Sequence, residues 1–254
     1  MMNGHAHELK WHTSYWPLIV SVGILFLLPL AFGFYFVYHK PLAAVISMGI
    51  GAPLVLISIV GWVREGIEDE HGIGMGLALW AMPFFILAEA MLFVGFFVAY
   101  WVTRLTAPVW PPAGTPEISV AVPVIMTIIL VASSFTMHMA EGHLEEEHYN
   151  RGGFIFWLIV TMVLGSAFLG ISMFEWTELY HEGFFFSTNI FSSAFFSITG
   201  FHGSHVLVGL SLFLCILLPA LSGKVNGTFV KSASVYWHFV DIVWFFVVSQ
   251  LYFW

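Results

Sequence analysis

A single carboxylate, Glu89, stands in the middle of the apolar run Met75–Val102 (MGLALWAMPFFILAEAMLFVGFFVAYWV), which is long enough to cross a membrane. Hydrocarbon offers no water to backbone N–H and C=O groups, so a chain crosses it as a helix or in a closed barrel. The run has no alternation of apolar and polar residues, which argues against a barrel strand. Glu89 therefore lies near mid-depth of a helix, where an ionisable side chain costs at least about 2.5 kcal/mol and has to face other helices. It is either a functional acid or a protonated side chain that hydrogen-bonds a neighbouring helix.

The composition is that of an integral membrane protein. Of the 254 residues 59% are hydrophobic and 9% are charged, with a mean hydropathy of +0.91, whereas about a quarter of the residues in soluble domains are charged. The single cysteine, Cys215, excludes a disulfide framework and a paired-cysteine metal site. The net charge of −8 argues against nucleic acid as a partner. No Ser-His-Asp pattern or glycine-rich phosphate loop supports a hydrolase or a nucleotide-binding protein. We also expect no removable signal peptide.

Seven stretches reach the length of about 20 apolar residues that a spanning helix needs. They are Trp16–Val37, Leu42–Val63, Met75–Val102, Val120–Met139, Phe154–Phe174, Asn189–Leu218 and Ser232–Trp254. The short connection between the first two predicts a helical hairpin over residues 16–63, and the other five predict a bundle over residues 75–254. The predicted fold is therefore an all-α membrane protein, a single polytopic domain over residues 1–254.

The basic residues predict the orientation, because cytoplasmic loops carry an excess of lysine and arginine. With the N-terminus on the inner side, five basic residues lie inside and two outside. The inner ones are Lys10, Arg64, Arg151, Lys224 and Lys231, and the outer ones are Lys40 and Arg104. Seven spans then place the C-terminus on the outer side. Two acidic loops, 64–71 and 141–148, fall inside and either gather protons or cations or form a solvated surface.

Twelve histidines raise the question of a haem or copper site. His202 and His205 are three residues apart in the sixth span and share one helix face, but a haem or redox copper needs further ligands at the same depth. We interpret both as contacts between helices, together with Glu175 near the end of the fifth span, and we predict no metal ligand in the chain.

His238 and Asp241 lie three residues apart in the seventh span, so both side chains are on one face of that helix. The aspartate is well below the predicted surface. The two groups either neutralise each other or bind a group on the sixth span. With Glu89, they are the candidate proton-related residues of the chain.

Three stretches of the chain carry a resemblance to a known family. They are Ala88–Phe97 (AEAMLFVGFF), Thr199–Gly209 (TGFHGSHVLVG) and Tyr236–Phe246 (YWHFVDIVWFF), and they occur in the order in which that family has them. The chain resembles subunit III of the haem–copper cytochrome c oxidases, in which the first of these stretches is the third helix with its intramembrane glutamate. Trp110-Pro111-Pro112 also falls where that family has it. The resemblance extends over all seven spans.

This resemblance implies a non-catalytic subunit of a proton-pumping cytochrome c oxidase. The haems and copper then belong to the partner subunits I and II, and cytochrome c binds the complex instead of this chain. The implied fold is V-shaped, with helices 1–2 separated from helices 3–7 by a cleft that binds phospholipids. The implied roles are support of proton uptake, of stability and of lipid and oxygen access to subunit I. Glu89 is then the carbodiimide-reactive acid, and Trp62 and Arg64 bind lipid headgroups.

The implied location is a bacterial cell membrane or the mitochondrial inner membrane, with the N-terminus on the cytoplasmic or matrix side. The chain departs from the family at Glu68-Asp69-Glu70-His71, where a second arginine and a His-His pair are common. Two alternatives stay open. One is subunit III of a quinol oxidase, which usually lacks the first two helices. The other is a proton-coupled transporter using Glu89 and Asp241, although the sequence has no internal repeat of the kind that transporters show.

Overall fold

All regular structure in the described part of the chain is helical. The computed structural model describes residues 15–68, 74–144 and 150–253, apart from the side chains of residues 36, 62–68 and 74–81. Within these ranges seven helical stretches are long and apolar enough to span a membrane. They are Trp16–Tyr35, Pro41–Gly61, Met82–Thr106, Ala121–Gly142, Arg151–His181, Ile190–Leu221 and Gly227–Leu251. The prediction of an all-α protein with seven spanning helices is confirmed.

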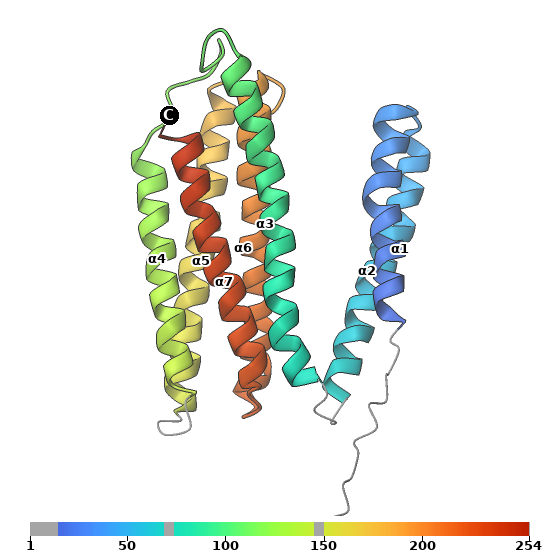
Figure 1. Cartoon of the computed structure of the whole chain (residues 1–254), viewed down its shortest axis with the longest axis vertical. Helices are drawn as coiled ribbons and strands as arrows, with labels where there is room; N and C mark the ends of the chain where they lie inside the picture. The colour runs from blue at the N-terminus through green and yellow to red at the C-terminus, as the bar shows by residue number, and fades with distance from the viewer. Residues whose placement is uncertain (1–14, 69–73, 145–149, 254) are drawn as a thin grey trace, which may run out of the picture. The chain divides into compact units, whose positions relative to one another are not determined.

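The chain divides into two compact units, residues 1–73 and 74–254. The first unit is a helical hairpin, drawn in blue and cyan in Figure 1. Its first arm is α1 (Trp16–Leu25) followed by the wider turns η1 (Phe26–Leu30) and η2 (Gly33–Val37), and its second arm is α2 (Pro41–Glu68). The V-shaped arrangement of the two bundles remains a prediction.

A side-chain hydrogen bond ties the two arms of the hairpin together close to a proline. Pro29 lies within η1 and has no N–H to donate. The hydroxyl of Ser47 on α2 donates a hydrogen bond of 2.6 Å to the carbonyl of Phe26 in the first arm. Gly51 permits this close approach, because a Cβ at that position would lie 2.5 Å from the backbone nitrogen of Leu27.

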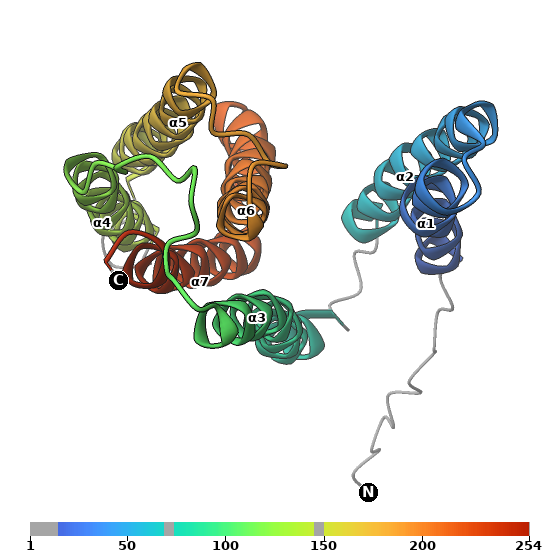
Figure 2. The same cartoon turned by 90° about the horizontal axis from the view of Figure 1, so that it is seen from above.

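The second unit contains five helices. They are α3 (Gly74–Thr106), α4 (Ala121–Gly142), α5 (Arg151–His181), α6 (Ile190–Leu221) and α7 (Gly227–Leu251). Seen from above in Figure 2, α4, α5, α6 and α7 form a closed ring, in which each helix contacts the next, and α3 packs outside it against α7 and α6. This arrangement places the side chains of α3 that face inward against the two helices that carry the candidate histidines.

Asparagine caps fix the beginnings of three helices. The side chain of Asn150 accepts a hydrogen bond from the N–H of Gly153, and Asn189 and Asn226 cap α6 and α7 in the same way. As a result α5 begins before the predicted Phe154 and α7 begins before the predicted Ser232. An apolar run marks the part of a helix that hydrocarbon covers, whereas the cap marks where the helix begins.

Trp237 of α7 fills the interior of the four-helix ring. Its side chain is fully buried, and its indole N–H donates a hydrogen bond of 3.0 Å to the hydroxyl of Ser133 on α4. A Cβ at Gly165 of α5 would lie 2.6 Å from the ring, and a Cβ at Gly209 of α6 would lie 2.7 Å from it. The indole therefore touches three other helices, and two of them approach it through a glycine.

Candidate functional site

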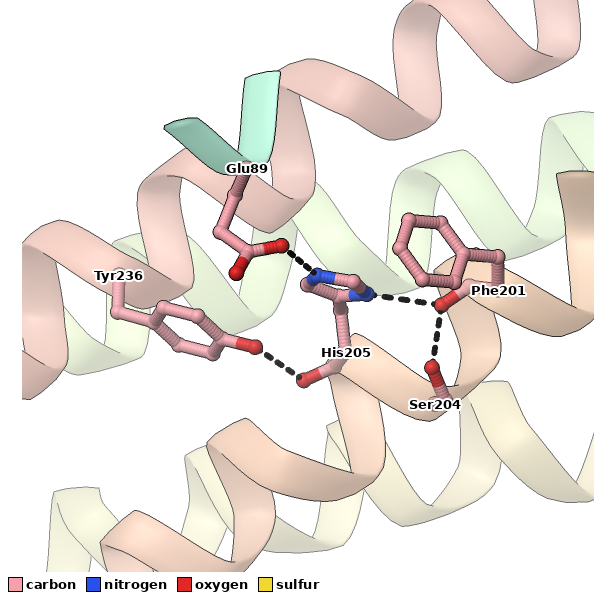
Figure 3. Close-up of polar contacts among 5 residues, drawn as sticks. All are labelled: Glu89, Phe201, Ser204, His205 and Tyr236. Carbon is pink, nitrogen blue, oxygen red and sulfur yellow. Dashed lines mark hydrogen bonds and ion pairs between the residues drawn. The ribbon is translucent and has the colours of Figure 1, made fainter. Parts of the chain in front are cut away.

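Glu89 of α3 pairs with His205 of α6 inside the five-helix unit, as Figure 3 shows. The distance from Glu89 Oε2 to His205 Nε2 is 3.1 Å, and the two side chains are 20% and 10% exposed. The other ring nitrogen, Nδ1, lies 2.8 Å from the backbone carbonyl of Phe201, one turn earlier in the same helix. The predicted intramembrane acid thus has a specific partner on a neighbouring helix.

The hydrogen-bond partners fix the number of protons in this pair. A carbonyl oxygen accepts and never donates, so His205 Nδ1 carries a hydrogen and donates it to Phe201. The contact between Nε2 and Glu89 then holds one further proton. It resides either on the carboxyl, which donates to a neutral ring, or on the ring, which donates to a carboxylate. Both forms have zero net charge, which is the state that a site within hydrocarbon favours.

Aromatic rings surround the pair and fix the orientation of the imidazole. Phe93 of α3 and Phe201 of α6 lie with ring centroids 5.1 Å and 4.6 Å from the His205 ring. Tyr236 of α7 donates a hydrogen bond of 3.2 Å to the carbonyl of His205, so α7 holds the backbone of the same residue. Three helices therefore contribute to the position of His205.

His238 and Asp241 of α7 share one partner, Ser134 of α4. The Ser134 hydroxyl lies 2.9 Å from His238 Nδ1 and also forms a hydrogen bond with Asp241 Oδ2. The sequence left two possibilities, mutual neutralisation or a partner on the sixth span. The structure joins the two groups through a serine of the fourth span instead. Asp241 is only 6% exposed, and within the part of the chain that the structure describes its Oδ1 has no hydrogen-bond partner.

A third polar contact joins α5 to the residue after α7. Tyr252 donates a hydrogen bond of 2.8 Å to Glu175 Oε2, and the glutamate is 8% exposed. Burial, and then the neighbouring carboxylate, raise the pKa of the Tyr252 hydroxyl well above its ordinary value of 10.0. The contact ties the end of α7 to α5, which is the structural kind of role predicted for Glu175.

His202 makes a different kind of contact from its neighbour on α6. It is 1% exposed and packs against Trp244, with ring centroids 5.1 Å apart, and against Phe168, with centroids 5.7 Å apart. Among the described residues neither of its ring nitrogens has a hydrogen-bond partner. His202 and His205 share a helix face, but their rings have separate surroundings.

Two predicted site residues, Trp62 and Arg64, have side chains that lie outside the described part of the chain. The loop residues 69–71 and 145–148 also lie outside it. Sequence reasoning missed Ser134 and Tyr252 as partners of buried acids. The sequence does contain a pattern that could have identified Ser134. Ser134, His138 and Glu141 are spaced so that three polar groups lie on one face of α4.

No group of three or more His, Cys, Asp or Glu side chains that could hold a metal ion occurs among the residues that the structure describes. The polar contacts of Glu89, Asp241 and Glu175 each contain one acid and at most one histidine.

Comparison with known proteins identifies the family. The family model "Cytochrome c oxidase subunit III" matches residues 5–254. The chain belongs to the cytochrome c oxidase subunit III family. A relative named "Cytochrome c oxidase subunit 3" from Synechocystis sp. is 36% identical over 180 residues, which are 69% of this chain and 75% of the relative. Relatives of the same name from Allomyces macrogynus and Mammuthus primigenius are each 33% identical and cover 98% of this chain, with 93% and 97% of their own lengths aligned.

Membership of the subunit III family confirms the resemblance that the three motifs predicted. It does not favour the two alternatives, a quinol oxidase subunit and a proton-coupled transporter. With seven helices able to cross a membrane in its described part, this member of the family is a multi-pass membrane protein, and the family implies a cytochrome c oxidase complex.

Proposed function

We propose that this chain is the non-catalytic subunit III of a proton-pumping haem–copper cytochrome c oxidase. The observation that carries the proposal is the match of the family model to residues 5–254, which include all seven spans. In this assembly subunits I and II hold the haems and copper, cytochrome c docks on the complex, and phospholipids bind this chain. The membrane is a bacterial cell membrane or the mitochondrial inner membrane. The N-terminus lies on the cytoplasmic or matrix side and the C-terminus on the outer side.

The geometry around Glu89 supports a role in modulating the partner instead of relaying protons to it. A relay needs a group on each side that both accepts and releases a proton. His205 Nδ1 donates to the Phe201 carbonyl, and a backbone carbonyl does not pass a proton on. Protons therefore enter and leave the pair only on the Glu89 side. The neutral pair holds α3 against α6 and stabilises the surface that α3 presents to lipid or to subunit I.

For Trp62 and Arg64 the proposal is a site for lipid headgroups. It is supported by the family resemblance and by the backbone of α2, which stays helical through both residues to Glu68. Arginine pairs with phosphate through two parallel hydrogen bonds, and tryptophan prefers the membrane interface, so both residue types suit the end of a spanning helix.

Affinity purification of the tagged chain from its native membranes in mild detergent tests the assignment. We expect co-purification of a haem-bearing subunit and of a subunit with a two-cysteine copper domain. An identically tagged multi-pass protein of another family is the control for carry-over of membranes. Recovery of the chain without any haem protein would contradict the assembly. A partner that lacks the copper domain would indicate a quinol oxidase.

A second measurement tests the non-catalytic role separately. The chain expressed without the other subunits should show no haem absorbance and no oxygen reduction. Haem or copper coordinated by this polypeptide alone would contradict the proposal even if the complex assembles as expected.

A further inference from the structure

A polar stripe on α4 leads to the buried acid on α7. Ser134, His138 and Glu141 are spaced i, i+4 and i+7, so they lie on one face of α4, and Glu141 is one residue before the end of that helix. Ser134 shows that this face is turned towards α7, because it contacts His238 and Asp241 there. Glu141 and His138 on this face act electrostatically on the half-buried His238 of α7. The stripe thus extends from the end of α4 to Asp241.

The hydrogens that Ser134, His238 and Asp241 share can be arranged in two ways. The two arrangements differ in whether a proton is on His238 Nδ1 or on Asp241. A hydroxyl has one hydrogen, so Ser134 donates to only one of its two partners at a time. When it donates to the Asp241 carboxylate, His238 Nδ1–H donates to the serine oxygen. When Asp241 is protonated and donates to the serine, the serine donates to an unprotonated His238 Nδ1. The hydroxyl of Ser134 contacts both His238 and Asp241, as either arrangement requires.

We propose that Asp241 is a proton-accepting site that is loaded from the Glu141 end of α4 through His238 and Ser134. His238 takes up a proton at Nε2 from the side of His138 and Glu141 and becomes an imidazolium. Its Nδ1–H bond then breaks as the proton moves to the serine oxygen, while the serine O–H bond breaks as its proton moves to Asp241. His238 is left neutral with its hydrogen on Nε2, and Asp241 is left as a carboxylic acid. One proton enters, and no electron moves.

The surroundings of Asp241 make it an end point of this path. The carboxyl is almost fully buried and, within the described residues, Oδ1 has no hydrogen-bond partner to which a proton could move on. Burying a carboxylate with an unpaired oxygen is costly, and protonation removes the charge. The site therefore stores a proton. This differs from the Glu89–His205 pair, in which the contact between Glu89 and Nε2 holds one proton in both forms.

This inference extends the sequence-based prediction that His238 and Asp241 are proton-related residues, and its test does not depend on oxidase activity. The purified full chain in lipid nanodiscs is followed by infrared spectroscopy. The carbonyl band of the protonated Asp241 is assigned as the band that Asp241→Asn removes, and its shift is timed after transfer to D2O. In Ser134→Ala we expect this hydrogen exchange to slow roughly 100-fold, the lower end of what a positioned proton-transfer group contributes. Ser134→Thr keeps the hydroxyl and should restore the rate.

Ser133→Ala is the matched control, because that neighbouring buried serine binds Trp237 and lies off the path. In Ser133→Ala the rate of hydrogen exchange at Asp241 should equal that of the unmodified chain. If Ser134→Ala does not fold, His238→Gln replaces it, since an amide does not take up and release protons in this range, and the same slowing is expected. Equal rates in the unmodified chain and in Ser134→Ala, or in His238→Gln, would overturn the proposal. So would the absence of a protonated Asp241 band at every pH at which the chain is folded. Failure to assemble with an oxidase would leave these outcomes unchanged and would count only against the proposed function.

Discussion

The Glu89–His205 pair makes a quantitative prediction about stability. Glu89→Ala leaves His205 Nε2 without its partner in a side chain that is 10% exposed. An unsatisfied buried polar group costs about 1–3 kcal/mol, and side-chain hydrogen bonds between membrane helices contribute about 0.6–1.7 kcal/mol. We therefore expect Glu89→Ala to lower the free energy of unfolding by about 1–2 kcal/mol. Glu89→Gln keeps a hydrogen-bond donor of the same size at the same place, so it should lower the free energy of unfolding by less than about 0.5 kcal/mol.

Reversible unfolding of the purified chain in mixed detergent micelles measures these differences. A double-mutant cycle with His205→Ala isolates the interaction, and the coupling energy should lie near 1 kcal/mol, within the range of about 0.6–1.7 kcal/mol. The control is Glu117→Ala, because Glu117 is exposed and lies in the connection between α3 and α4. A substitution there should change stability by less than about 0.5 kcal/mol.

Two outcomes would contradict a hydrogen bond in which protonated Glu89 donates to His205. A coupling energy of zero would mean that the hydrogen bond does not form in the membrane-like environment. Equal destabilisation by Glu89→Gln and Glu89→Ala would mean that the charged form of the glutamate carries the contact. In the assembled oxidase, Glu89→Gln should leave assembly intact and change the rate of oxygen reduction only modestly. Complete loss of oxygen reduction would contradict the accessory role.

Two further substitutions test contacts of the five-helix unit. The pKa of the Tyr252 hydroxyl is raised in the folded state. The contribution of Tyr252 to the free energy of unfolding is therefore fully present below pH 10.0 and is lost as the pH rises further. Tyr252→Phe should remove this loss of stability at high pH. At neutral pH it should lower the free energy of unfolding by about 1–3 kcal/mol, because Glu175 is left without its hydrogen-bond donor. Chemical unfolding at several pH values measures both effects. Gly165→Ala should cost about 1–3 kcal/mol through its clash with Trp237. The control is Gly170→Ala in the same helix, where no atom lies within 4 Å of the added Cβ, and it should be neutral or stabilising by up to about 1 kcal/mol in the same assay.

The number and type of the helices could be predicted from the sequence because each spanning segment satisfies its own backbone. Apolar length is therefore a local signal, and it identified all seven spans. The ends of α5 were less predictable. Polar residues from Glu175 onward signalled an exit from hydrocarbon, but the helix continues to His181, since a helix outside hydrocarbon is not limited by apolar length.

The partners of the buried groups could not be predicted in the same way. The spacing of His202 and His205 places both on one face, but which helix covers that face depends on packing between distant segments. Glu89 and His205 are 116 residues apart, and Glu175 and Tyr252 are 77 apart. Ser134 carries no charge and has a serine on one side and a phenylalanine on the other, so its residue type alone gives no hint of a shared contact with His238 and Asp241.

The indole of Trp237 has a consequence for how this protein can move. The ring contacts α4 through Ser133, and it contacts α5 and α6 at glycines, Gly165 and Gly209. If one of these helices slid by a turn, or rotated by a residue, a bulkier side chain would enter the volume of the ring. Piston-like or screw-like displacement within this group of helices is thereby blocked. Any rearrangement inside this group of helices is therefore left to the side chains and their hydrogen bonds.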